Sequence, residues 1–271
     1  MRLRPEPAPL LAGLASAALT FALAAPSPSA APASAQARVS ALEDLLFGVT
    51  SDGLTLSVLQ SNLRIESGAP AGAPNGRGNL IVGYAEGTIG TGTHNLVLGT
   101  EGVYDGSSSI VAGERCISSA DYTFVSGLDC EASGVGAAAL TGYRSVASGS
   151  GSTVLTGIFC EATGTYATVQ SGISGLASGT AAVAGGGTSC TASGELSTVQ
   201  GGRGNVASGR ASVTVAGEDA RAEGEGSVVL AGLENVAAGS RSVVGAGFAN
   251  PEKAASVSVT PSIQVPAVCS V

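Results

Sequence analysis

Residues 203–217 read RGNVASG followed by RASVTVAG, and this two-part unit decides the fold. The first half has seven residues and ends at Gly209, and the second has eight and ends at Gly217. The same alternation of steps between glycines runs from Gly127 to Gly247, which makes eight consecutive 15-residue repeats without a slip. A short fixed period of this kind is the signature of a solenoid.

The residues between the glycines favour strands over helices. A glycine every seven or eight residues would cost a helix about 1 kcal/mol each, whereas Val, Thr and Ser suit a pleated surface. We therefore expect one short strand in each half and a turn at its glycine, where a positive φ carries no steric penalty. The predicted fold class is all-β, a parallel β-roll of 15-residue (7+8) coils stacked at about 4.8 Å. A disordered Gly/Ser/Ala-rich tract is the alternative that composition allows, but the unbroken register argues against it.

Small residues recur at fixed positions, which predicts confined interior sites stacked coil upon coil. In the long half, Ser at position three, Val at position five and Ala at position seven share one parity and are also expected inside. The fifth position of the short half is always alanine: Ala132, Ala147, Ala162, Ala177, Ala192, Ala207, Ala222 and Ala237.

The opposite parity of the long half is too apolar for an isolated surface. It carries pairs such as Val213 with Val215 and Val228 with Leu230. An exposed apolar stripe along a solenoid indicates a partner. Self-association around a three-fold axis would cover it.

The pattern Asn-Val-Ala-Ser-Gly-x-x-Ser-Val-x-Val-Ala-Gly resembles the head repeat of trimeric autotransporter adhesins, the YadA-like left-handed parallel β-roll. The resemblance covers residues 79–247 and includes Asn205 and Asn235. It implies an intertwined homotrimer, a role in surface adhesion, and a host or extracellular-matrix ligand. Full-length members end in a coiled-coil stalk and a membrane anchor, whereas here only residues 248–271 follow the roll, so no membrane anchor is expected.

The segments before the roll are predicted in order. Residues 1–37 read as a signal peptide, with a basic start, an Ala/Leu-rich core and cleavage expected after Ala37, with Ala24 or Ala35 as alternatives. Cleavage would release a secreted or cell-surface protein, and a non-cleaved anchor is the alternative. Residues 38–78 are predicted as a short amphipathic helix over 38–48, two lead-in strands at 54–58 and 62–65 that cap the solenoid, and a loop.

The ends of the repeat region are less regular. Three strand-glycine units begin at Asn79, Asn95 and Ser109, spaced by 16 and then 14 residues, and are predicted as degenerate coils. Atypical terminal repeats are expected in a solenoid. The β-roll domain is therefore predicted over 79–247, and residues 248–271 are predicted as a flexible tail.

Composition agrees with an exported solenoid that binds no nucleic acid. The 271 residues carry a net charge of −8, and the sequence contains no Trp. An acidic chain is repelled by nucleic acid and by anionic membranes.

Four of the five cysteines, Cys116, Cys130, Cys160 and Cys190, occupy the third position of the short half. Cys116 and Cys130 fall on adjacent coils, at a separation that a disulfide can span, so they are the disulfide candidate. Cys160 and Cys190 lie two coils from their column neighbours, about 10 Å away, and are expected to pair between subunits or to stay buried. Cys269 is left as a tail thiol. No metal site is predicted, because pairs at C-x₂-C spacing are absent.

Catalysis finds no support, so we predict no enzyme activity and no cofactor. His94, the only histidine, precedes a strand and reads as a solvated turn residue. The run 185–187 of three glycines is not followed by the Lys-Ser/Thr of a phosphate loop. Four acidic residues, Glu218, Asp219, Glu223 and Glu225, cluster at turns and read as a solubilising face rather than a calcium site.

These observations predict a secreted structural or adhesive protein whose β-roll, as a trimer, presents a repetitive binding surface. The alternatives are a monomeric solenoid that binds an ordered surface, ice or polysaccharide, and a hexapeptide-type acyltransferase, whose period would be 18 rather than 15. The variable outward positions that are candidates for binding are Tyr143, Arg144, Phe159, Arg203 and Arg241.

Overall fold

The computed structural model describes residues 36–40, 49–51, 56–58, 63–68, 75–83, 88–249, 251–252 and 257–258. The chain divides into two units, Met1–Arg64 and Ile65–Val271. Of the signal peptide predicted over 1–37, only residues 36 and 37 are among the described residues. Cys269 lies outside them. No helix in the described ranges has the length and hydropathy of a membrane span.

The first unit contains a short helix and a hairpin. Residues 36–40 are helical, and the rest of the predicted helix, 41–48, lies outside the described residues. Strand β1 (Val49–Ser51) pairs antiparallel with β2 (Leu56–Val58), which lies within the strand predicted at 54–58. The strand that pairs with it therefore comes before it in the chain, not after it. The prediction of a second lead-in strand at 62–65 was wrong, because residues 63–65 are not in a strand.

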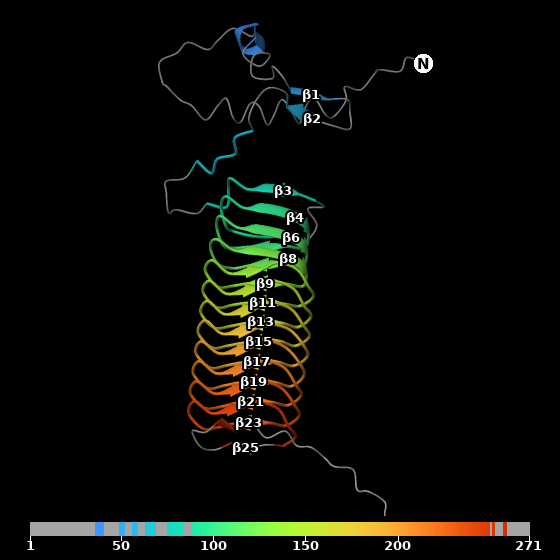
Figure 1. Ribbon diagram of the computed structural model, residues 1–271. Helices are drawn as coiled ribbons and strands as arrows, with labels where there is room; N and C mark the ends of the chain where they lie inside the picture. The colour runs from blue at the N-terminus through green and yellow to red at the C-terminus, as the bar shows by residue number, and fades with distance from the viewer. Residues whose placement is uncertain are drawn as a thin grey trace, which may run out of the picture. The chain divides into compact units, whose positions relative to one another are not determined.

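The second unit is a parallel β-solenoid, whose coils stack along one axis (Figure 1). Every complete coil after the first contributes one strand to each of two sheets, which confirms the predicted fold class. The first, 13-stranded sheet contains β3 (Leu80–Val82), β4 (Leu96–Thr100), β6 (Ile110–Glu114), β8 (Phe124–Leu128), β10 (Ala138–Ala139), β12 (Thr153–Val154), β14 (Thr168–Val169), β16 (Val183–Ala184), β18 (Thr198–Val199), β20 (Val213–Thr214), β22 (Val228–Val229), β24 (Val243–Val244) and β26 (Val257–Ser258). The second, 11-stranded sheet contains β5 (Val103–Tyr104), β7 (Ile117–Ser118), β9 (Glu131–Ala132), β11 (Val146–Ala147), β13 (Glu161–Ala162), β15 (Leu176–Ala177), β17 (Thr191–Ala192), β19 (Val206–Ala207), β21 (Arg221–Ala222), β23 (Val236–Ala237) and β25 (Pro251–Glu252).

The register confirms the repeat and its irregular start. Leu80 pairs with Leu96 and Leu96 with Ile110, which are the predicted steps of 16 and 14 residues. From Ala138, which pairs with Thr153, to Val243 the step is 15, and the last step, from Val243 to Val257, is 14. The ladders also continue past the predicted boundary at Gly247, because β25 pairs with β23 and β26 with β24.

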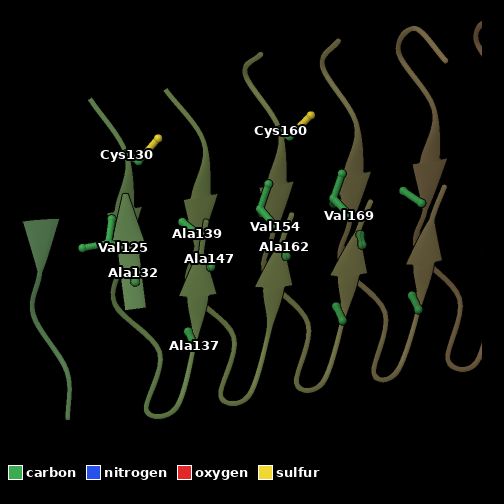
Figure 2. Close-up of a cluster of buried hydrophobic side chains, with 14 of the residues drawn as sticks. Val125, Cys130, Ala132, Ala137, Ala139, Ala147, Val154, Cys160, Ala162 and Val169 are labelled. Atoms are coloured by element: carbon green, nitrogen blue, oxygen red, sulfur yellow. The ribbon is translucent and has the colours of Figure 1, made fainter. Parts of the chain in front are cut away.

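The interior of the roll is thin and built from stacked columns (Figure 2). All eight alanines of the short-half column are fully buried, and they share the interior with the valine column of the 13-stranded sheet, represented by Val154, Val169 and Val199. The serines at position three, such as Ser152, are buried as predicted. The prediction that position seven of the long half faces the interior was wrong. Ala216 and Ala231 are only half-buried and Ala246 is exposed, because the chain has already begun to turn there.

Both glycine columns lie close to the next coil, but only one of them also has a positive φ. The glycines that end the long halves, such as Gly172 (φ 115°), have positive φ, as predicted. Those that end the short halves do not, and they are required by close approach instead: a Cβ on Gly179 would lie 2.0 Å from the carbonyl oxygen of Gly194 on the next coil. Turn conformation therefore explains only one column.

One coil interrupts the apolar interior. The buried hydrophobic residues form one cluster that ends at Ala207 and another that starts at Ala220. Between them lie the polar side chains of Asn205, Ser212 and Thr214, all fully buried. The hydroxyl of Thr214 has no hydrogen-bond partner among the residues that the structure describes, and its column neighbours are Val199 and Val229.

Replacing Thr214 with valine is therefore expected to stabilise the roll by about 1–2 kcal/mol, because an unsatisfied buried hydroxyl is exchanged for a methyl group of similar shape. The urea midpoint of unfolding measures the change. Thr168→Val on the outward face of β14 is the control and should change stability by less than about 0.5 kcal/mol. A lower midpoint for Thr214→Val would contradict this account of the column.

Candidate functional site

The outward side chains of the 13-stranded sheet form an apolar surface, here named the outer stripe. Residues such as Val213, Val215 and Val228 on it are half-buried within the single chain. More than a third of each of the following side chains is exposed: Leu80, Val82, Leu98, Ile110, Phe124, Leu155 and Leu230. Exposed apolar surface along one face of a solenoid is typical of an interaction site.

A polar hollow interrupts the outer stripe near its middle. It has a volume of about 280 Å³ and lies where Gly185 has no side chain, between Gln170 and Gln200. Thr198 adds a hydroxyl to its lining. Gly185, the first of the three consecutive glycines at 185–187, therefore belongs to this break in the stripe.

The cysteine column has a structural role that the sequence did not reveal. The thiol of Cys160 donates to the carbonyl oxygen of Gly172 on the next coil at 3.5 Å, and Asn205 Nδ2 donates to that of Gly217 at 3.1 Å. Cys116, Cys130, Ser145, Cys190 and Asn235 make the equivalent contact. Cys, Ser and Asn share the column because each is a small side chain with a hydrogen-bond donor.

Cys116 and Cys130 lie in register on adjacent coils, since their neighbours Ile117 and Glu131 pair. Both are buried and occur as free thiols, as do Cys160 and Cys190. The interaction of each thiol with the other raises the pKa of Cys116 and lowers that of Cys130, while burial raises both pKa values. Their disulfide stays a prediction.

Three of the predicted binding positions come together on one turn edge. The guanidinium carbon of Arg144 lies 5.1 Å from the ring centroid of Tyr143 and 5.9 Å from that of Phe159 on the next coil. The two rings pack edge to face with centroids 5.6 Å apart. We name Tyr143, Arg144 and Phe159 the aromatic-arginine cluster.

The other candidate positions lie outside this cluster, Arg203 four coils further along the same turn edge. Arg203 pairs with Glu218 at 3.2 Å, and Arg241 lies on the opposite turn, with its side chain over Gly226. His94 is exposed at a turn. Of the acidic residues, Glu225 pairs with Arg210 and Glu223 approaches Arg221, and within the described ranges no three metal-binding side chains converge.

The second sheet carries a column of outward Ser and Thr side chains, here named the hydroxyl ladder, that the repeat pattern did not lead us to predict. After each strand from β7 to β19 comes an outward Ser or Thr, and no side-chain hydrogen bond to a described residue engages these hydroxyl groups. The column could have been found by aligning the repeats at position six of the short half. Its members are Ser119, Ser133, Ser148, Thr163, Ser178, Ser193 and Ser208.

No protein-family model matches this chain, and no curated protein is significantly similar to it in sequence.

Proposed function

We propose that this protein is a secreted, non-enzymatic adhesive protein whose β-roll associates as a homotrimer and presents a repetitive surface to its ligand. The outer stripe is the observation that carries the proposal. The interior of each coil is too thin to bury much apolar area, yet side chains such as Leu155 and Leu230 remain 38% and 45% exposed. Burial between subunits would gain about 25 cal/mol for each Å² of apolar surface removed from water.

Three-fold symmetry is taken from the resemblance to adhesin heads. Closed symmetry also suits a rod with one apolar sheet face, because every copy can bury the same stripe. In such an assembly the 13-stranded sheets face inward, and the second sheet with its hydroxyl ladder faces out. Export follows from the signal peptide predicted over 1–37.

The hydroxyl ladder favours one alternative function, a monomeric solenoid that binds an ordered surface such as ice or polysaccharide. Seven successive hydroxyl-bearing side chains recur once per coil, at the roughly 4.8 Å spacing of neighbouring strands. The outward threonines of the 13-stranded sheet, Thr153, Thr168 and Thr198, are interrupted by Val183. Inhibition of ice recrystallisation by the wild-type chain, abolished by Ser178→Ala with Ser193→Ala, would support this alternative.

Light scattering after size exclusion tests the trimer. The mature chain, which begins at Arg38 after the predicted cleavage, is expected at three times its own mass, with and without reductant. Leu155→Asp combined with Leu230→Asp places two carboxylates in the outer stripe and is expected to give folded monomers, because both side chains are exposed within one chain. Burying unpaired charges at an interface costs several kcal/mol.

The matched control is Leu176→Asp, an outward substitution on the second sheet that should leave the trimer intact. Circular dichroism checks that every variant keeps its β-sheet signal. A wild-type chain that is monomeric, or a double variant that remains trimeric, would contradict the proposal.

A further inference from the structure

The aromatic-arginine cluster occupies an unusual place in the turns. The second residue of the short half has a left-handed backbone in every coil from Asp129 on, and most members of this column are small or acidic. The bulky left-handed residues of this column are Arg115 (φ 53°), Arg144 (φ 51°) and Phe159 (φ 56°), and the last two lie on successive coils. Bulky side chains are uncommon at positive φ, and strained residues concentrate at functional sites.

The two rings orient the guanidinium of Arg144. Both ring centroids lie within the roughly 6 Å over which a cation is attracted to an aromatic face. The Arg144 side chain is nevertheless 56% exposed, and that of Phe159 is 45% exposed. The cluster thus presents an oriented cation beside an apolar ring to solvent.

The nearest carboxylate is already engaged. Arg115 contacts both oxygens of Asp129, Oδ1 through Nε at 2.5 Å and Oδ2 through Nη2 at 3.2 Å. The hydrogen bond from Arg115 lowers the pKa of Asp129, which keeps that carboxylate charged. Arg144 Nε forms a longer ion pair with Oδ2 of the same carboxylate, at 3.8 Å. Because Asp129 is held more closely by Arg115, the Arg144 guanidinium is only weakly paired, and its side chain stays exposed to a ligand.

We propose that the aromatic-arginine cluster binds the carboxylated sugar unit of an acidic saccharide. A guanidinium fork pairs with a carboxylate through two parallel hydrogen bonds. The exposed ring of Phe159 fits the apolar C–H face of the same pyranose, and Ile158, 42% exposed, extends that apolar surface. The open turn edge suits one unit of an extended saccharide chain. This inference rests on the proposed adhesive function, for which it names the ligand class.

Isothermal titration calorimetry of the full chain tests the site with two acidic probes, a hyaluronan hexasaccharide carrying uronate and a sialyllactose carrying sialate. Chitohexaose and lactose are the neutral controls. At least one acidic probe is expected to bind, and which one binds identifies the source of the carboxylate. Equal binding of the neutral partner, no binding of either acidic probe, or equally tight binding of a poly-glutamate peptide would overturn the proposal.

Substitutions in the cluster test whether the saccharide binds there. Arg144→Gln is expected to weaken it about tenfold or more, as for loss of a hydrogen bond to a charged group. Arg144→Lys should restore only part of the affinity, because an ammonium lacks the fork. Phe159→Ser should weaken binding without changing the preference for acidic probes. Arg210→Gln is the control, since that guanidinium is taken up by Glu195 and Glu225 on the opposite turn. Unchanged affinity in Arg144→Gln would sink the assignment.

The site and the proposed assembly can fail separately. A trimer by light scattering that binds no acidic saccharide leaves the proposed function and removes the site. A monomer whose binding of an acidic probe depends on Arg144 leaves the site and removes the trimer.

Discussion

Replacing Gly194 with alanine is expected to unfold the middle of the roll, at a cost of about 3 kcal/mol or more. A Cβ at this position would lie 2.1 Å from the carbonyl oxygen of Gly209 and 2.7 Å from its carbonyl carbon. Both atoms belong to the backbone of the next coil, which is itself held by the sheet hydrogen bonds. The coils must therefore separate locally, and the ladders on either side lose their pairing.

Gly201→Ala is the matched control, seven residues further along. No atom lies within 4 Å of a Cβ there, and its column carries alanine at Ala216, Ala231 and Ala246. Its stability should change by less than about 0.5 kcal/mol. Urea unfolding followed by circular dichroism compares the two variants. Similar midpoints would mean that the coils can spread without loss and that close approach does not explain the short-half glycines.

The second large effect is expected in the alanine column. Ala177→Val adds two methyl groups where the side chain is fully buried and every column neighbour is alanine, so overpacking should cost about 1–3 kcal/mol. Ala184→Val makes the same chemical change on the facing sheet, where the column neighbours in register are Val169 and Val199. This variant should be neutral or more stable by about 1 kcal/mol, because the added methyl groups are buried in a column built for valine.

Thermal unfolding of the two variants under identical conditions separates the columns. A roll that tolerated Ala177→Val as well as Ala184→Val would have an interior wide enough to adjust, contrary to the thin interior described here. If both variants were strongly destabilised, the valine column would be as confined as the alanine column.

Sequence reasoning predicted most of the solenoid because its signals repeat. A single glycine or alanine is weak evidence, but Ala132 and its seven equivalents recur at one position of a 15-residue period, and strand alternation then decides which positions face inward. The wrong predictions concern residues whose structure the 15-residue period does not determine. Residues 63–65 alternate like a strand but have no repeat neighbour to pair with, and Ala246 has the inward parity but lies after the strand has ended.

The candidate site was only half accessible to the sequence. Tyr143, Arg144 and Phe159 were recognisable as variable outward positions, as were Arg203 and Arg241. Their grouping depends on the coil step, which places the Phe159 ring beside that of Tyr143. It also depends on the hydrogen bond that Arg115 donates to Asp129. Neither the direction of a long side chain nor the partner it selects follows from a residue's place in the repeat.

The sequence by itself determined the period, the two strands per coil and the small interior columns, because one local pattern repeated many times leaves only one register that buries the small residues. Only the tertiary structure decided why the short-half glycines are needed, what the Cys/Ser/Asn column bonds to, and which arginine is only weakly paired with its carboxylate. Each of these depends on contacts between coils, where distances of a few tenths of an ångström and competition between neighbouring charges decide the outcome.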